Sequence, residues 1–235
     1  MTPLPLPELA CRRPVPQRAA LAAAGACLAA ALLAACASGP KPPDWSINAV
    51  GHIERATQAY LQGDARVQAR EFELARAEVA RTGRPDLLAR VALARCAAQV
   101  ASLQLDACTA FDPLRTDATD TERAYADYLA GHTLPAAQAA LLPEAHRAVA
   151  AGGTALPAAD APLARLIAAG VLLRRSQLSP EQVNQAVDTA SHQGWRRPLL
   201  AWLGVQARLA DERGDTEAAA RARRRMDVVQ PPTQP

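Results

Sequence analysis

Apolar residues recur every three or four positions along most of the chain after residue 44, which is the period of a helix with one buried face. In residues 46–62 this pattern is carried by Ile53, Ala56 and Tyr60. No segment of useful length alternates apolar and polar residues with the period of two that is typical of a half-buried β-strand. The pattern therefore predicts an all-α protein.

Turn residues divide this pattern into separate helices. Gly63-Asp64 and Gly214-Asp215 each end one helix, and each aspartate can cap the helix that follows. About seven to nine helices are predicted. They cover about 46–62, 64–81, 86–103, 121–130, 143–150, a segment from 161, 179–194, 197–213 and a last helix to about 229.

The middle of the chain, residues 104–162, has a weaker helical pattern than the segments on either side. Phe111-Asp112-Pro113, Leu134-Pro135 and the run GGTALPAADAP all interrupt it. We expect short helices and loops here, loosely ordered, within one helical domain that spans residues 44–230. The prolines that follow predict a disordered tail over residues 231–235.

The first 35 residues follow a different pattern. Three arginines, at positions 12, 13 and 18, precede an apolar run from Ala19 to Ala35 that consists mostly of alanine. This order is typical of a cleaved secretory signal peptide, and the run is at the short limit for a permanent membrane span. Residues 36–43 then form a proline-rich tether with a reach of about 20 Å.

The apolar run ends Leu33-Ala34-Ala35-Cys36, which resembles the lipobox of bacterial lipoproteins. This resemblance implies that the chain is cleaved before Cys36 and that Cys36 carries acyl chains, which anchor it to membrane lipid. Ala37 stands where an aspartate would retain a lipoprotein in the inner membrane, so the resemblance implies the periplasmic face of the outer membrane. An ordinary cleaved signal with an incidental cysteine is the alternative.

The Gly-Asp turns between helices resemble those of the tetratricopeptide (TPR) repeat family. After Gly63, Phe72 and Ala75 stand at the aromatic and small positions of that family, and Ala56 matches the small residue before the turn. At the second Gly-Asp turn, Arg223 stands where the aromatic residue is expected. The resemblance implies an array of antiparallel helical hairpins. The whole chain also resembles helical outer-membrane lipoproteins of beta-proteobacteria, a likeness that implies no activity.

Charge and cysteine content set further limits. The full chain has a net charge of +3, and removal of residues 1–35, with three arginines and one glutamate, leaves +1. Such a small charge gives no electrostatic support for nucleic-acid binding. Cys96 and Cys108 remain in the processed chain, and an oxidising compartment favours a disulfide between them. Two free thiols are the alternative.

The sequence lacks the local motifs of common enzymes and metal sites. It has no HExxH, no Gly-rich phosphate loop and no GxSxG, and its four histidines share no metal-ligand spacing. We therefore expect no metal, no other cofactor and no enzymatic activity. An enzyme that acts on peptidoglycan, an activator of such an enzyme, and a purely structural envelope protein are the alternatives.

Aromatic and basic residues supply the candidates for an interaction surface. The candidate partner-binding residues are Tyr60, Phe72, Trp195 and Trp202. The two tryptophans, seven positions apart, would stack along a helix that begins at the first of them. We expect both in the core, and an exposed peptide-docking surface is the alternative. The arginine cluster 221–225 complements the dipole of the last helix, or it contacts anionic lipid headgroups. These features favour a membrane-anchored scaffold or assembly factor that binds an envelope protein.

Overall fold

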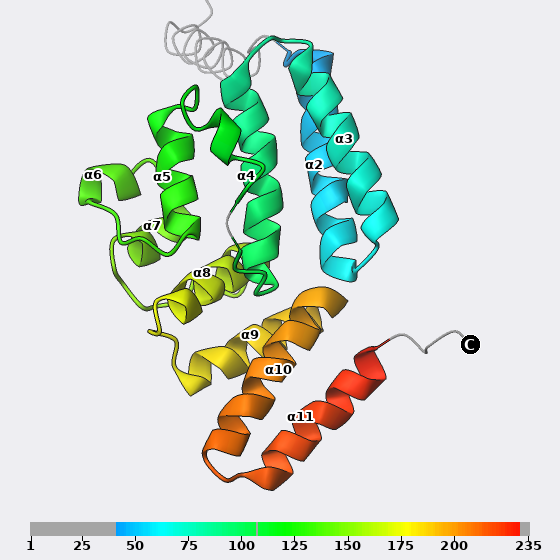
Figure 1. Cartoon of the computed structure of the whole chain (residues 1–235), viewed down its shortest axis with the longest axis vertical. Helices are drawn as coiled ribbons and strands as arrows, with labels where there is room; N and C mark the ends of the chain where they lie inside the picture. The colour runs from blue at the N-terminus through cyan, green and yellow to red at the C-terminus, as the bar shows by residue number, and fades with distance from the viewer. Residues whose placement is uncertain (1–40, 107, 231–235) are drawn as a thin grey trace, which may run out of the picture. The chain divides into compact units, whose positions relative to one another are not determined.

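The structure, a computed structural model, describes residues 41–106 and 108–230, and all their regular secondary structure is helical (Figure 1). This confirms the predicted all-α class. The described residues form ten α-helices and one short 3-10 helix. The nine α-helices other than α6 correspond to the predicted segments, and α6 has only four residues. The helices are α2 (Asp44–Gln62), α3 (Ala65–Ala80), α4 (Pro85–Ala101), η2 (Asp112–Leu114), α5 (Asp120–Leu129), α6 (Ala136–Ala139), α7 (Glu144–Ala150), α8 (Pro162–Arg174), α9 (Pro180–His192), α10 (Arg196–Glu212) and α11 (Thr216–Val229).

Helices α2 and α3 form the first antiparallel hairpin (Figure 1). Gly63 ends α2 in the left-handed conformation, with a φ of 88°, and the Asp64 side chain accepts a hydrogen bond of 3.0 Å from the amide of Val67. Ala56 and Ala75 are fully buried between the helices. Their small side chains allow the two helices to approach closely, and Phe72 fills the remaining space.

Helices α10 and α11 form a second hairpin with the same kind of turn. Gly214 has a φ of 74°, and Asp215 accepts a hydrogen bond of 2.9 Å from the amide of Ala218. Arg223, at the position where the TPR family has an aromatic residue, pairs with Asp211 of α10. A surface ion pair thus replaces the buried ring of the first hairpin.

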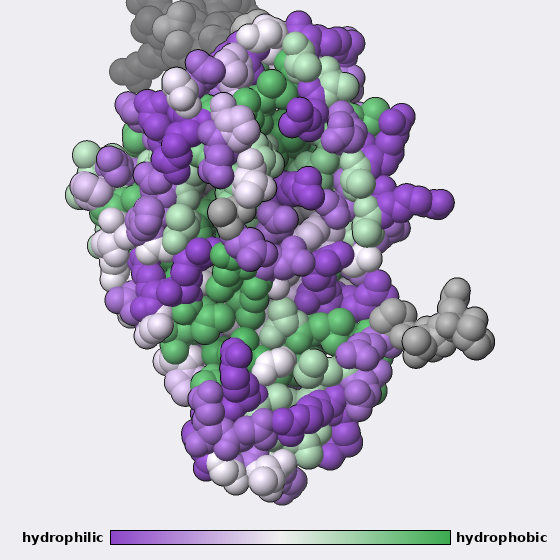
Figure 2. All heavy atoms as spheres, viewed as in Figure 1, coloured by the Kyte–Doolittle hydropathy of each residue, from purple (hydrophilic) through white to green (hydrophobic). Residues whose placement is uncertain are grey.

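Helices α4, α8, α9 and α10 pack in succession and hold the larger hydrophobic core. Where α8 crosses α4, a Cβ at Gly170 would lie 2.5 Å from the carbonyl oxygen of Val100, so only glycine permits this crossing. Trp202 of α10 is fully buried and donates a hydrogen bond of 3.0 Å to the carbonyl of Ala101 at the end of α4. In the view of Figure 2, hydrophobic residues gather where α8 to α10 lie in Figure 1.

The middle segment contains η2 and the short helices α5, α6 and α7. Helices α5 and α7 match the predicted helices 121–130 and 143–150 to within one residue at each end. The guanidinium of Arg175, just after α8, donates hydrogen bonds of 2.7 Å to the carbonyls of Gly131 and Val149. These bonds attach the loops of the middle segment to the core helices.

A disulfide joins Cys96 of α4 to Cys108 in the following loop, and their Cα atoms lie 5.7 Å apart. Cys96 is buried, so the bridge reaches from the core to the loop. The chain that leaves α4 is therefore held beside the helix that it has just left.

The end of α2 lies against the start of α10. The Trp195 indole donates a hydrogen bond of 3.2 Å to Oε1 of Gln58, and Nε of Arg197 donates one of 2.9 Å to the carbonyl of Tyr60. The Arg197 guanidinium also lies 4.5 Å from the centre of the Tyr60 ring. We call these contacts the α2–α10 junction. They attach the first hairpin to the main core.

The four candidate partner-binding residues are all core residues. Tyr60 and Phe72 are 4% exposed, Trp195 6% and Trp202 0%. Helix α10 begins at Arg196, so Trp195 precedes the helix and does not stack along it with Trp202. The expectation of an exposed aromatic surface is therefore wrong, because these four rings pack in the hydrophobic clusters between helices.

Several predictions concern residues outside the described part of the chain. They are the signal peptide over 1–35, lipidation at Cys36, most of the tether over 36–43 and the tail over 231–235. Among the helices within residues 41–106 and 108–230, none combines the length and the apolar character needed to span a bilayer.

Candidate binding cleft

A cleft of about 860 Å³ opens between α2, α4, α5, α7 and α8. This volume lies within the range of sites that take small ligands or side chains of a partner. Most of the residues on its walls are apolar. They include Ile53 and Leu61 of α2, Leu93, Ala94 and Ala97 of α4, Leu163, Ala164 and Ile167 of α8, and Trp195.

Helical spacing brings these residues to one surface. Ile53, Thr57 and Leu61 lie four residues apart on α2, so they follow one face of that helix. Ala94 of α4 and Ala164 of α8 have small side chains, which leave the cleft open where larger ones would fill it.

Exposed aliphatic residues of α2 continue beyond the cleft. Ile47 and Val50 lie one to two turns before the cleft-lining part of α2, and their side chains are 48% and 53% exposed. Exposed aliphatic side chains next to an apolar cleft are typical of an interaction surface. We call Ile47, Val50 and the residues of α2 that line the cleft the α2 strip; the lining residues are Ile53, Glu54, Thr57, Gln58 and Leu61.

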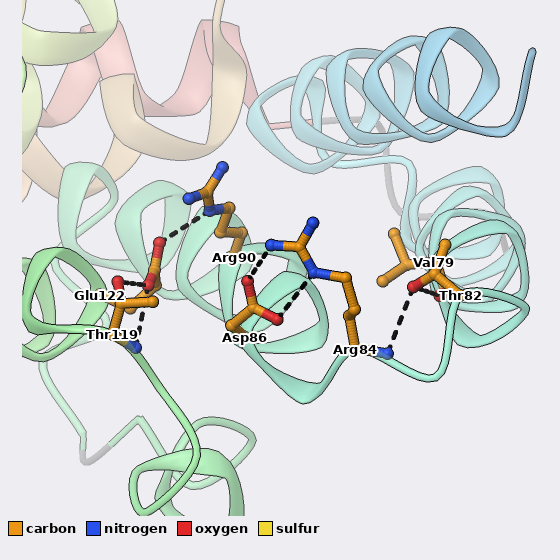
Figure 3. Close-up of polar contacts among 7 residues, drawn as sticks. All are labelled: Val79, Thr82, Arg84, Asp86, Arg90, Thr119 and Glu122. Atoms are coloured by element: carbon orange, nitrogen blue, oxygen red, sulfur yellow. Dashed lines mark hydrogen bonds and ion pairs between the residues drawn. The ribbon is translucent and has the colours of Figure 1, made fainter. Parts of the chain in front are cut away.

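One ion pair lies at the rim of the cleft (Figure 3). Nε of Arg90 on α4 donates a hydrogen bond of 2.7 Å to Oε1 of Glu122 on α5. Oε2 of the same carboxylate accepts bonds from the amide and the hydroxyl of Thr119, which cap the start of α5. Burial disfavours ionisation of Glu122, but the bonds from Thr119 and Arg90 outweigh it and lower the pKa of this carboxyl. Glu122 is therefore an ionised structural residue.

Arg90 has donors left over for a ligand. Its side chain is 57% exposed, and only Nε contacts Glu122. In Figure 3 the two terminal nitrogens of Arg90 extend past this contact, and within the described residues they have no hydrogen-bond partner. A guanidinium in this position can bind a carboxylate of a bound molecule.

An aromatic cluster lies between α5 and α7 at one side of the cleft. Tyr125 and His146 line the cleft, and their ring centres lie 5.6 Å apart. Nδ1 of His146 lies 3.2 Å from the hydroxyl of Tyr128, and the two rings are 5.2 Å apart. Burial lowers the pKa of His146 to about 4 and raises that of Tyr128. His146 is thus neutral near pH 7, and its Nδ1 can accept a hydrogen bond from the Tyr128 hydroxyl.

These titratable groups are unsuited to proton transfer near neutral pH. A general acid needs a raised carboxyl pKa, whereas Glu122 has a lowered one, and His146 protonates only in acid. Within the residues that the structure describes, no three His, Cys, Asp or Glu side chains are grouped so as to hold a metal ion. The cleft is suited to binding an apolar surface.

Comparisons of the chain with known protein families, with curated proteins and with solved structures found no match. The functional interpretation therefore rests on the residues that line the cleft and on the sequence pattern.

Few of the residues selected from the sequence contribute to this cleft. Trp195 borders it, whereas Tyr60, Phe72 and Trp202 do not line it. The cleft combines five helices that are distant in sequence, and periodicity within one helix cannot reveal that. The one signal in the sequence is that residues 86–103 have no single polar face, which is typical of a helix with neighbours on several sides.

Proposed function

We propose that this protein is a lipid-anchored, non-enzymatic lipoprotein on the periplasmic face of the outer membrane. It binds an envelope protein through the apolar cleft, as a scaffold or assembly factor. The observation that carries the proposal is an open, mostly apolar cleft in which the buried Glu122 and His146 are hydrogen-bonded within the fold. A peptidoglycan enzyme has less support, because neither Glu122 nor His146 has the pKa that such an acid needs.

The occupant that fits the cleft is an amphipathic helix of the partner. The α2 strip extends from Ile47 to Leu61, which is about 21 Å along the helix axis, or four turns of a helix laid beside it. Recognition of this kind buries the apolar face of the partner helix in a groove. An acidic residue on the partner helix would bind the free donors of Arg90.

The lipid anchor rests on the sequence around Cys36. A tether over residues 36–43, with its reach of about 20 Å, keeps the helical domain near the bilayer. Cys36→Ser should move the protein to the soluble fraction, and mass spectrometry should show that the acyl chains are lost. A Cys36→Ser variant that stays wholly in the membrane and still carries the mass of the acyl chains would contradict the proposed lipidation of Cys36.

The binding proposal is tested by photo-crosslinking in cells. A photoreactive amino acid at Thr57, inside the cleft, should capture one dominant envelope protein. The same amino acid at Ala69, an exposed residue of α3, should not. Ala94→Trp fills the cleft and should abolish this capture, and Arg90→Glu should reduce it several-fold.

The matched control for the filled cleft is Ala69→Trp, which adds the same side chain at a distant exposed position. It should leave the capture at Thr57 unchanged. Equal capture from both crosslinking positions, or capture that survives Ala94→Trp, would show that the cleft is not the binding site. This result would leave the anchor untouched, because Cys36→Ser tests that separately.

A further inference from the structure

The outward face of α11 combines cations with an exposed apolar side chain. Arg221, Arg224, Arg225 and Val228 are three or four residues apart, so they share one face of this helix. Together with Leu199 of α10 they line a shallow hollow of about 510 Å³.

Two of these arginines have no ion pair among residues 41–106 and 108–230. Arg221 pairs with Glu217, one turn earlier. Within the described part of the chain, Arg224 and Arg225 make no ion pair, although Asp227 follows them on the same helix. Helix geometry places Asp227 about 160° from Arg225 around the axis but only about 60° from Arg224, three residues earlier. The end of α11 therefore presents Arg225 without an acidic neighbour on its face, and Arg224 beside a carboxylate with which it makes no ion pair.

Val228 is 86% exposed, more than any other large apolar residue that the structure describes. The packing of α11 on α10 does not require it, since Ala219 and Ala222 on another face of the helix are the buried contacts. An exposed aliphatic side chain flanked by unpaired arginines is the arrangement of helices that lie at a lipid–water interface.

We infer that the C-terminal end of α11 docks on an anionic lipid surface. Arg224 and Arg225 donate hydrogen bonds to phosphate oxygens of the headgroups, and Val228 enters the apolar edge of the bilayer. Free phosphate shares the headgroup chemistry, but it offers nothing for Val228 to enter, so the pair of features favours lipid.

This surface is weak by itself. Two arginines near an anionic membrane strengthen binding about 30-fold, which does not hold a free protein on a membrane. A short tether raises the local concentration of lipid to the millimolar range or above, where a weak site is occupied. In this respect the inference rests on the proposed anchor. Docking would fix the orientation of the anchored domain.

The test places an environment-sensitive fluorophore at Val228→Cys in the processed, acylated protein, reconstituted into vesicles. The acylation of Cys36 is first confirmed by mass. With vesicles that contain phosphatidylglycerol, the emission should shift to the blue, and spin-labelled lipid should quench it. Both effects should disappear with phosphatidylcholine alone and weaken in high salt.

The decisive variant is Arg224→Gln/Arg225→Gln, which should lower the docking equilibrium about 30-fold. Its matched control is Arg66→Gln/Arg70→Gln, which removes the same charge from exposed residues of α3 and should have no effect. Equal quenching in both double variants, the same shift with phosphatidylcholine, or a shift with inorganic phosphate alone would overturn the inference.

The test also separates this inference from the proposed anchor. If no acyl mass is found, the anchor has failed, and vesicle flotation of the same labelled chain at high lipid concentration tests the α11 surface directly. Flotation that does not depend on Arg224 and Arg225 would then overturn the docking inference.

Discussion

The α2–α3 and α10–α11 hairpins share one turn but differ in what lies between their helices. Each has a left-handed glycine followed by an aspartate cap. The first hairpin buries Phe72 in a small hydrophobic cluster that also includes Val91 of α4, whereas α10 contributes Trp202 to the main core. The turn therefore determines that a hairpin forms, and the residues between the helices determine how firmly it is held.

The largest expected effect compares the two cores. Trp202→Ala should lower the free energy of unfolding by about 4 kcal/mol, and Phe72→Ala by about 3 kcal/mol, since both remove a buried ring. Denaturant unfolding measures these values. For Phe72→Ala, hydrogen exchange should become faster in α2, α3 and the start of α4 only, because Val91 belongs to the same cluster. Faster exchange throughout α4 and α8 as well would show that the two clusters unfold as one.

Acid should affect the main core through His146. The unfolded chain protonates this histidine near pH 6.5, but the folded chain does so only at about pH 4, so stability falls as the pH decreases through this window. The loss attributable to His146 is about 3 kcal/mol between pH 7 and pH 4. The free energies of unfolding of the wild type and of His146→Gln should diverge by this amount between pH 7 and pH 4. Parallel pH profiles would show that His146 does not cause the loss of stability.

The disulfide should stabilise the main core and leave the first hairpin unchanged. Replacing both cysteines, Cys96→Ala and Cys108→Ala, should cost about 3 kcal/mol, because the bridge closes a loop with a sequence separation of 12. Non-reducing mass analysis should also show the bridge in the untreated protein. Two alkylatable thiols in that protein would show that the bridge does not form.

The smallest effects distinguish the two turns. Gly63→Ala and Gly214→Ala should each cost about 1 kcal/mol, because both positions require a positive φ. A Cβ at Gly63 would also lie 2.9 Å from the guanidinium of Arg196, whereas a Cβ at Gly214 would have no neighbour within 4 Å among the described residues. Because the guanidinium is the flexible end of a side chain and can move aside, Gly63→Ala should be only slightly the more destabilising in thermal unfolding. The reverse order would show that the α2–α10 junction adjusts freely.

Local signals predicted most of the fold. The Gly-Asp turns and the Ser179-Pro180 start of α9 act through neighbouring residues, so the sequence around them is sufficient. The start of α10 was harder to predict, because Trp195 and Pro198 both fit near the first turn of a helix. The helix begins at Arg196, and Trp195 before it is held by a hydrogen bond to the distant Gln58.

The site was less accessible to prediction than the fold. An aromatic residue on an amphipathic helix suits the core and an exposed surface equally well, and only the positions of other helices decide between them. Tyr60 is covered by Arg197, and Trp202 by the end of α4. The cleft also depends on alanines at 94 and 164, which read as ordinary helix formers in the sequence.

The α2–α10 junction has a consequence for the order of folding. Gln58 and Trp195 are separated by 137 positions, so this contact closes a very long loop. Such closure is slow compared with the local pairing that forms a hairpin. The first hairpin can form early, but it reaches its final place only after about four-fifths of the chain has been synthesised. A chain that stops before residue 195 would leave the end of α2, including the face of the Tyr60 ring that Arg197 covers, without its contacts to α10.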